Sequence, residues 1–114
     1  MLAATLQRGW RSFVSYEAMK RDEVLSLVAT HREDLQRLGV KRLNLFGSVA
    51  RDEARSDSDV DFLVEFSIEA GLFDLFRVQH YLEDLLECQI DLGTEDALKE
   101  HLRAPVMRDL ICVF

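Results

Sequence analysis

The sequence has few cysteines, no long apolar segment and fewer basic than acidic side chains. Its two cysteines, Cys88 and Cys112, are far apart and form no CxxC pair, which disfavours a disulfide framework or a zinc site. No apolar run approaches the roughly 20 residues that span a bilayer, so we expect no membrane anchor. A reducing, cytoplasmic location is therefore the expectation.

The shortage of basic side chains also limits the classes of partner. Lysine and arginine number 14 against 21 aspartates and glutamates, which gives a net charge of −7. This balance disfavours direct binding of nucleic acid through a basic surface. It does not exclude a nucleotide substrate, because a metal ion can screen phosphates from an acidic site.

The length of 114 residues, 48% of them apolar, predicts a single domain with a modest core. We assign this domain to residues 19–114, because Met19 begins a segment that reads as a natural start. Residues 1–18 lack the apolar core of a signal peptide and are expected to be a flexible or helical extension. No internal repeat, linker or low-complexity stretch is visible.

Hydrophobic periodicity predicts alternating helices and strands. We expect helices over 19–38 and 71–87, strands over 40–47, 59–66 and 88–93, and helices over 95–102 and from Pro105 to 113. The buried stripe of the second helix is expected to be Leu72, Leu75, Phe76, Leu82, Leu85 and Leu86. These elements predict an α/β (α+β) fold with helices packed on a small mixed sheet of three to four strands.

Two carboxylates begin the second predicted strand. Asp59 and Asp61 are two positions apart, so both point to one face of the strand, roughly 7 Å from each other. Asp91, in the third strand, would join them if the two strands are neighbours. Such a cluster would repel itself unless it held divalent cations, and magnesium prefers sites of this kind. The alternative is that Asp59 and Asp61 are solvated charges at a strand end.

A Gly-Ser pair ends the first predicted strand. Gly47 lets the backbone approach a ligand closely, and Ser48 offers a hydroxyl and an N–H donor. Arg51 or Arg55 would add positive charge for a phosphate group, although both are equally well explained as solvated loop residues.

The order of these residues resembles the GS-x10-DxD signature of the DNA polymerase beta-like nucleotidyltransferase superfamily. The segments LFGSVARDEARSDSDVDFLV and QIDLGTEDALKEHLRAPVMRDLI are similar to the minimal nucleotidyltransferase (MNT) antitoxin family. The resemblance runs from Met19 to about Val113 and places Asp91 at the family's third carboxylate. It implies a nucleotidyltransferase-like core.

The resemblance also implies a function. Asp59 and Asp61 would bind Mg2+, Asp91 would act as a further ligand or as the base, and Gly47, Ser48 and Arg51 would hold the triphosphate of ATP. Many such proteins silence a HEPN-domain ribonuclease toxin by moving AMP onto one of its tyrosines, and they bind it directly. We therefore expect a magnesium-dependent protein adenylyltransferase that forms a hetero-oligomer with a HEPN toxin.

Two departures and two alternatives accompany this resemblance. Asp52 replaces a frequent glycine of the family's first loop, and Gly93 and Thr94 stand in place of the more usual apolar residue and polar pair after Asp91. The alternatives are a binding-only antitoxin with a degenerate site and a transferase for a small molecule. The chain has no room for a separate acceptor domain, which disfavours the second alternative.

Overall fold

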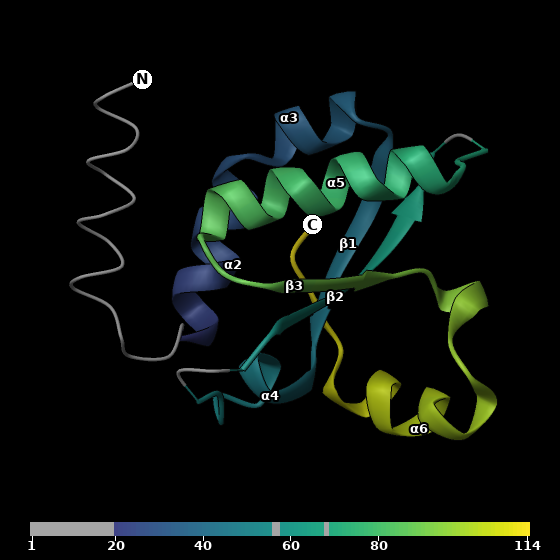
Figure 1. The fold of residues 1–114 in the computed structure, drawn as a ribbon. Helices are drawn as coiled ribbons and strands as arrows, with labels where there is room; N and C mark the ends of the chain where they lie inside the picture. Colours follow the sequence, from purple (N-terminus) through teal and green to yellow (C-terminus); the bar gives the residue numbers. More distant parts are fainter. Residues whose placement is uncertain (1–19, 56–57, 68) are drawn as a thin grey trace.

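The sheet of the computed structural model has four strands in the order β3-β2-β1-β4 (Figure 1). They are β1 (Val40–Phe46), β2 (Val60–Phe66), β3 (Ile90–Gly93) and β4 (Ile111–Cys112). Strand β1 pairs antiparallel with β2 and with β4, whereas β2 and β3 are parallel. The prediction of a mixed α/β fold with up to four strands is confirmed.

The structure describes residues 20–55, 58–67 and 69–114. The predicted extension over residues 1–18 and the domain start at Met19 lie outside these ranges. No helix within them is both long enough and apolar enough to cross a membrane. Cys88 and Cys112 form no disulfide in the described part of the chain.

Three helices cover one face of the sheet and enclose the core (Figure 1). They are α2 (Arg21–Thr30), α3 (Arg32–Arg37) and α5 (Leu72–Leu86). Alternation along β2 points Val60, Phe62 and Val64 into this core, and all three are almost fully buried. The opposite face of β2 carries Asp61, so the core fixes the strand while leaving its carboxylate on the other side of the sheet.

The prediction of one continuous helix up to residue 38 is wrong, because the chain turns at His31 between α2 and α3. The His31 backbone N–H donates to the carbonyl of Val28, and its ring Nδ1 contacts the carbonyl of Leu27 at 2.9 Å. These local contacts satisfy the end of α2. The turn lets Leu35 of α3 pack into the core.

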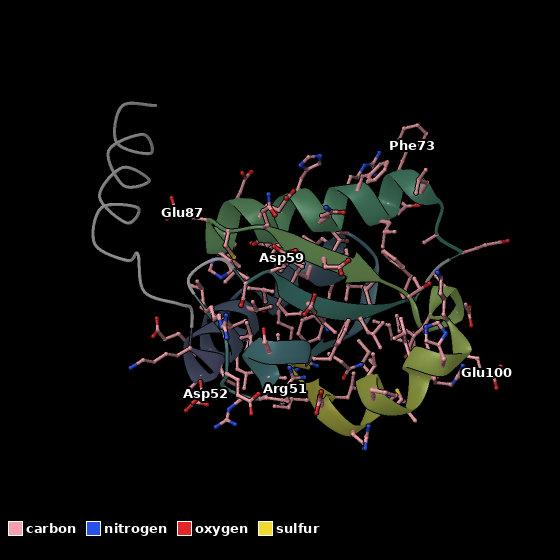
Figure 2. The ribbon with its side chains drawn as sticks, turned by 60° about the horizontal axis from the view of Figure 1, so that its bottom comes forward. Arg51, Asp52, Asp59, Phe73, Glu87 and Glu100 are labelled. Carbon is pink, nitrogen blue, oxygen red and sulfur yellow. The ribbon has the colours of Figure 1, made fainter. Side chains whose placement is uncertain are left out.

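The predicted buried stripe of α5 is only partly right. Val78, Leu82 and Leu86 are buried, whereas Leu72 is 64% exposed and Phe76 is 45% exposed. The first turn of α5 lies at the periphery of the molecule, and Phe73 points outward there (Figure 2). The amphipathic pattern thus identified the helix but not the length over which it contacts the sheet.

The C-terminal predictions need the largest correction. In place of a helix over 95–102, a 3-10 turn, η1 (Glu95–Ala97), is followed by α6 (Glu100–Asp109), which contains Pro105 in its interior. The segment predicted as the end of a helix forms β4, because the Val113 N–H donates to the Leu43 carbonyl at 2.9 Å. Helix α6 has no buried residue and lies on the sheet face opposite α5 (Figure 1).

Candidate functional site

The Gly-Ser pair begins a short helix, α4 (Gly47–Ala50), directly after β1, so Gly47 does not belong to the strand as predicted. Gly47 has φ 77°, a left-handed conformation that favours glycine. A Cβ atom at Gly47 would collide with a carboxylate oxygen of Asp61 and lie 3.1 Å from its Cγ. Glycine is therefore required at position 47 for two reasons: the left-handed backbone conformation and the closeness of Asp61. Ser48 follows it and is half-buried.

The third predicted carboxylate lies beside the second. Strands β2 and β3 pair in a register that sets Asp61 directly opposite Asp91. Ile90 and Leu92 are buried, so alternation along β3 turns Asp91 to the same face as Asp61. Asp59 precedes β2 and is exposed. The structure thus brings together two motifs that are 30 residues apart in the sequence.

The proximity of these carboxylates changes the titration of Asp61. Burial, the negative charges of Asp91 and Asp59, and a side-chain hydrogen bond to Asp91 raise the pKa of Asp61 from 3.8 to about 6. The positive charge of Arg51 opposes this shift, because it favours the ionised form of Asp61. The cluster therefore carries repulsion that one arginine does not cancel.

The cluster fits a divalent cation by its chemistry. Carboxylate oxygens on one face suit Mg2+, which commonly keeps several waters and shares substrate phosphates as ligands. Within the described residues, however, no three His, Cys, Asp or Glu side chains already form a metal-ligating arrangement. The residues with suitable chemistry to hold a cation are Asp59, Asp61 and Asp91. In this structure their side chains do not surround a single position.

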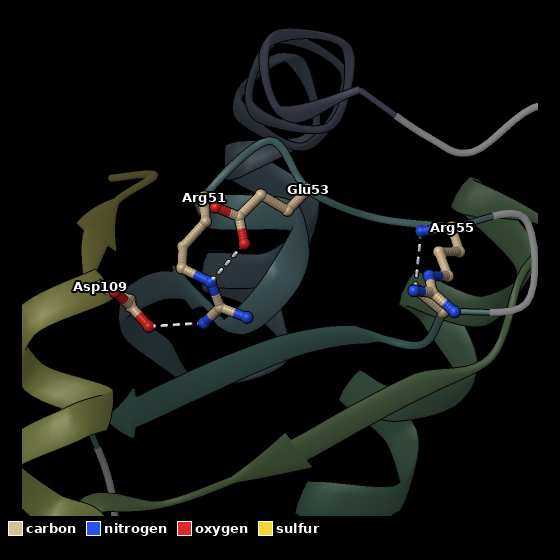
Figure 3. Close-up of polar contacts among 5 residues, drawn as sticks. Arg51, Glu53, Arg55 and Asp109 are labelled. Carbon is tan, nitrogen blue, oxygen red and sulfur yellow. Dashed lines mark hydrogen bonds and ion pairs between the residues drawn. The ribbon is translucent and has the colours of Figure 1, made fainter.

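Arg51 is held by two carboxylates, neither of which was identified from the sequence (Figure 3). Its Nη1 donates to Oδ2 of Asp109 at 2.7 Å, and its Nε donates to Oε2 of Glu53 at 3.2 Å. Both contacts raise the pKa of Arg51, the one to Asp109 most. Asp109 ends α6, 58 residues along the chain, and no periodicity or motif predicts the pair.

Two neighbours of Arg51 in the loop, Arg55 and Asp52, make different contacts. Arg55 lies apart from Arg51, and its backbone N–H donates to Oγ of Ser58 at 2.8 Å (Figure 3). Asp52 has φ 59°, a left-handed conformation that aspartate tolerates better than most residues. Its Oδ1 accepts a hydrogen bond from the backbone N–H of Arg21 at 3.4 Å. Asp52 therefore replaces the family's glycine in a glycine-like conformation, and its carboxylate is engaged by the start of α2.

Three comparisons with known proteins agree with this geometry. The nucleotidyltransferase domain family matches residues 28–111. Protein adenylyltransferase MntA of Thermococcus cleftensis is 37% identical over 93 residues, which cover 81% of this chain and 94% of the relative. A solved structure described as a minimal nucleotidyltransferase shares 39% identity with a TM-score of 0.64, covering 82% of this chain and 95% of its own.

More distant structures share the fold. A complex of the tri-AMPylated HEPN toxin of Shewanella oneidensis with an MNT antitoxin contains a chain with 16% identity and a TM-score of 0.58. That match covers 79% of this chain and 71% of the other. The family profile, the close relatives and the arrangement of the Gly-Ser turn beside the paired carboxylates lead to one conclusion: this chain belongs to the minimal nucleotidyltransferases, a branch of the nucleotidyltransferase domain family.

Proposed function

We propose that this chain is a protein adenylyltransferase that moves AMP from ATP to a tyrosine of a HEPN-domain toxin and thereby acts as its antitoxin. The known activities of similar proteins support this proposal. One relative is a protein adenylyltransferase, and structural neighbours are toxin–antitoxin complexes, one of them solved with AMP-PNP. The single observation that carries it is the register of Asp61 opposite Asp91, with Gly47 packed against Asp61.

In the proposed site, Gly47 and Ser48 hold the β- and γ-phosphates of ATP at the end of β1. Arg51 adds positive charge, and neither of its contacts to Asp109 and Glu53 uses its Nη2 atom, which can donate to phosphate. The two carboxylates fix the guanidinium in place.

The transfer itself needs little covalent chemistry from the protein. The tyrosine oxygen bonds to the α-phosphorus, the bond from that phosphorus to the oxygen of the β-phosphate breaks, and pyrophosphate leaves. Asp91 accepts the hydroxyl proton, and Asp59, Asp61 and Asp91 would hold Mg2+. When bound, the cation supplies charge neutralisation for the phosphates.

The acceptor comes from a partner, as the toxin–antitoxin complexes among the structural neighbours suggest. The net charge of −7 suits a basic, RNA-cutting partner and disfavours direct binding of nucleic acid. A hetero-oligomer in the cytoplasm, with residues 19–114 as the functional domain, is the corresponding cellular form.

The test is to incubate the purified protein with ATP labelled at the α-phosphate, Mg2+ and a purified HEPN toxin. We expect label on a toxin tyrosine, located by mass spectrometry, and none with the variant Asp59→Ala/Asp61→Ala. Equal labelling by the variant would disprove the mechanism. If the inactive variant still binds the toxin and protects cells as well as the wild type, protection comes from binding alone.

A further inference from the structure

A groove of about 590 Å3 opens beside the carboxylates, on the sheet face opposite α5. Asn44 of β1 and Leu63 of β2 contribute to it from the sheet, Met107 of α6 from the helix, and Thr94 from the segment after β3. None of the proposed phosphate- or metal-binding residues lines it. The function of this groove is therefore not explained by the nucleotide site alone.

The groove lies on the far side of the carboxylates from the Gly-Ser turn. Phe46 pairs with Asp61, and Asn44 pairs with Leu63. Gly47 follows Phe46, so the turn lies beyond Asp61 in one direction along β2, and the groove begins at Leu63 in the other. Alternation places Leu63 on the same face as Asp61, roughly 7 Å farther along the strand.

In-line displacement requires the acceptor and the leaving pyrophosphate to lie on opposite sides of the reacting phosphorus, as the groove and the Gly-Ser turn do relative to the carboxylates. The attacking and leaving oxygens approach the phosphorus from opposite sides. If pyrophosphate leaves toward Gly47 and Ser48, the attacking hydroxyl enters from the side of Leu63. The groove lies on that side and opens to solvent, which a polypeptide segment needs in order to enter.

The passage from Asp91 to the groove is kept open by a missing side chain. Gly93 pairs with Leu63, and it separates Asp91 from Thr94, a lining residue. A Cβ atom built on Gly93 would have no heavy atom within 4 Å. Its backbone is not left-handed, so a larger residue would fit the strand and would extend into this open space.

The charges around the groove are mostly paired. Glu65 lies 3.7 Å from Nζ of Lys41 and 4.0 Å from Nε of Arg42, and Glu95 accepts from Arg103 at 2.6 Å. The remaining wall includes Leu63 and other apolar side chains. Such a surface suits an uncharged aromatic side chain better than the anionic part of a nucleotide.

We propose that this groove receives the acceptor segment of the partner polypeptide and that Gly93 admits its tyrosine side chain to Asp91. The inference rests on the proposed function, and it adds the acceptor's binding surface and a residue that determines specificity. The tyrosine oxygen bonds to the α-phosphorus as the bond to the pyrophosphate oxygen breaks, and its proton passes to Asp91.

The test compares Gly93→Leu with Ala29→Leu. Ala29 is exposed on α2, which covers the opposite face of the sheet, and it does not line the groove. With the HEPN toxin as acceptor, Gly93→Leu should lower kcat/KM for toxin at least about tenfold and leave the Kd for Mg-ATP within about twofold. Ala29→Leu should leave both unchanged.

A second measurement uses the exposed Cys112, which lines the groove. In a Cys88→Ser background, prior alkylation with N-ethylmaleimide should block transfer to toxin and spare Mg-ATP binding. A further Cys112→Ser change should abolish this sensitivity.

Each outcome decides between the proposals. Normal transfer by both Gly93→Leu and the alkylated protein would overturn the inference and leave the proposed function intact. Loss of both Mg-ATP binding and transfer would assign the groove to the nucleotide and would also overturn the inference. If the wild type labels no toxin tyrosine while binding Mg-ATP, the proposed function fails, and the inference fails with it.

Discussion

Gly47 connects the two halves of the site at the scale of a single residue. Gly47→Ala would place a methyl group against the carboxylate of Asp61 and impose a left-handed conformation on alanine. We expect the free energy of unfolding to fall by about 1–3 kcal/mol. Mg-ATP affinity should fall as well, because Asp61 must move. Chemical denaturation and ATP titration measure the two effects.

The matched control is Gly93→Ala, since an added Cβ at Gly93 meets no heavy atom within 4 Å and its backbone is not left-handed. It should change neither quantity by more than a small fraction of the Gly47→Ala effect. Equal effects at the two glycines would show that the close approach of Gly47 to Asp61 is unimportant.

Asp61 gives a prediction about pH. Its pKa is raised from 3.8 to about 6, so the native state disfavours the ionised carboxylate. The stabilising contribution of the protonated form is complete below pH 3.8 and is lost as pH rises toward and beyond 6. Asp61→Asn cannot ionise, so in a metal-chelating buffer its Tm relative to wild type should be higher at pH 8 than at pH 5.

Thermal denaturation at the two pH values measures this difference. A pH-independent offset for Asp61→Asn would contradict the proposed repulsion among Asp59, Asp61 and Asp91.

At the scale of elements, the contact between Arg51 and Asp109 joins the end of α4 to α6. Asp109→Asn should weaken Mg-ATP binding several-fold, because the guanidinium loses one of the two carboxylates that fix it. The Tm should change little, since exposed ion pairs contribute little to stability. Isothermal titration and thermal denaturation measure the two effects.

The control for this variant is Glu95→Gln, which breaks another exposed ion pair, the one with Arg103. Its Mg-ATP affinity should equal that of the wild type. Tighter ATP binding by Asp109→Asn would mean that Asp109 competes with phosphate for Arg51 instead of positioning it.

Helices and strands could be predicted from the sequence where a single hydrophobic periodicity runs through the whole element. Alternation located β2 because its buried face contacts the core along most of its length. The same reasoning failed for β4, since a strand of two residues owes its identity to pairing with Asn44 and Leu45. The exposure of Phe76 was also unpredictable, because it depends on where the sheet ends.

For the whole molecule, the sequence predicted that the Gly-Ser turn and the carboxylates would lie together, but it did not predict their surroundings. The spacing of Gly47, Asp59 and Asp61 is a local pattern, and Asp91 was the only carboxylate in its strand. The contact of Asp109 with Arg51 joins elements 58 residues apart and follows from the packing of α6 on α4. The groove likewise exists only once β1, β2 and α6 have assembled.

The central claim is that the carboxylate supplied by β3 completes a transferase site built on β1 and β2. The most direct measurement is the rate of AMP transfer to toxin by Asp91→Asn, beside Asp22→Asn, which changes an exposed carboxylate of α2, as the control. A general base contributes about 10²–10⁴-fold, so kcat should fall by about that factor while the Tm stays near that of the wild type. Transfer by Asp91→Asn within about twofold of wild type would contradict the account.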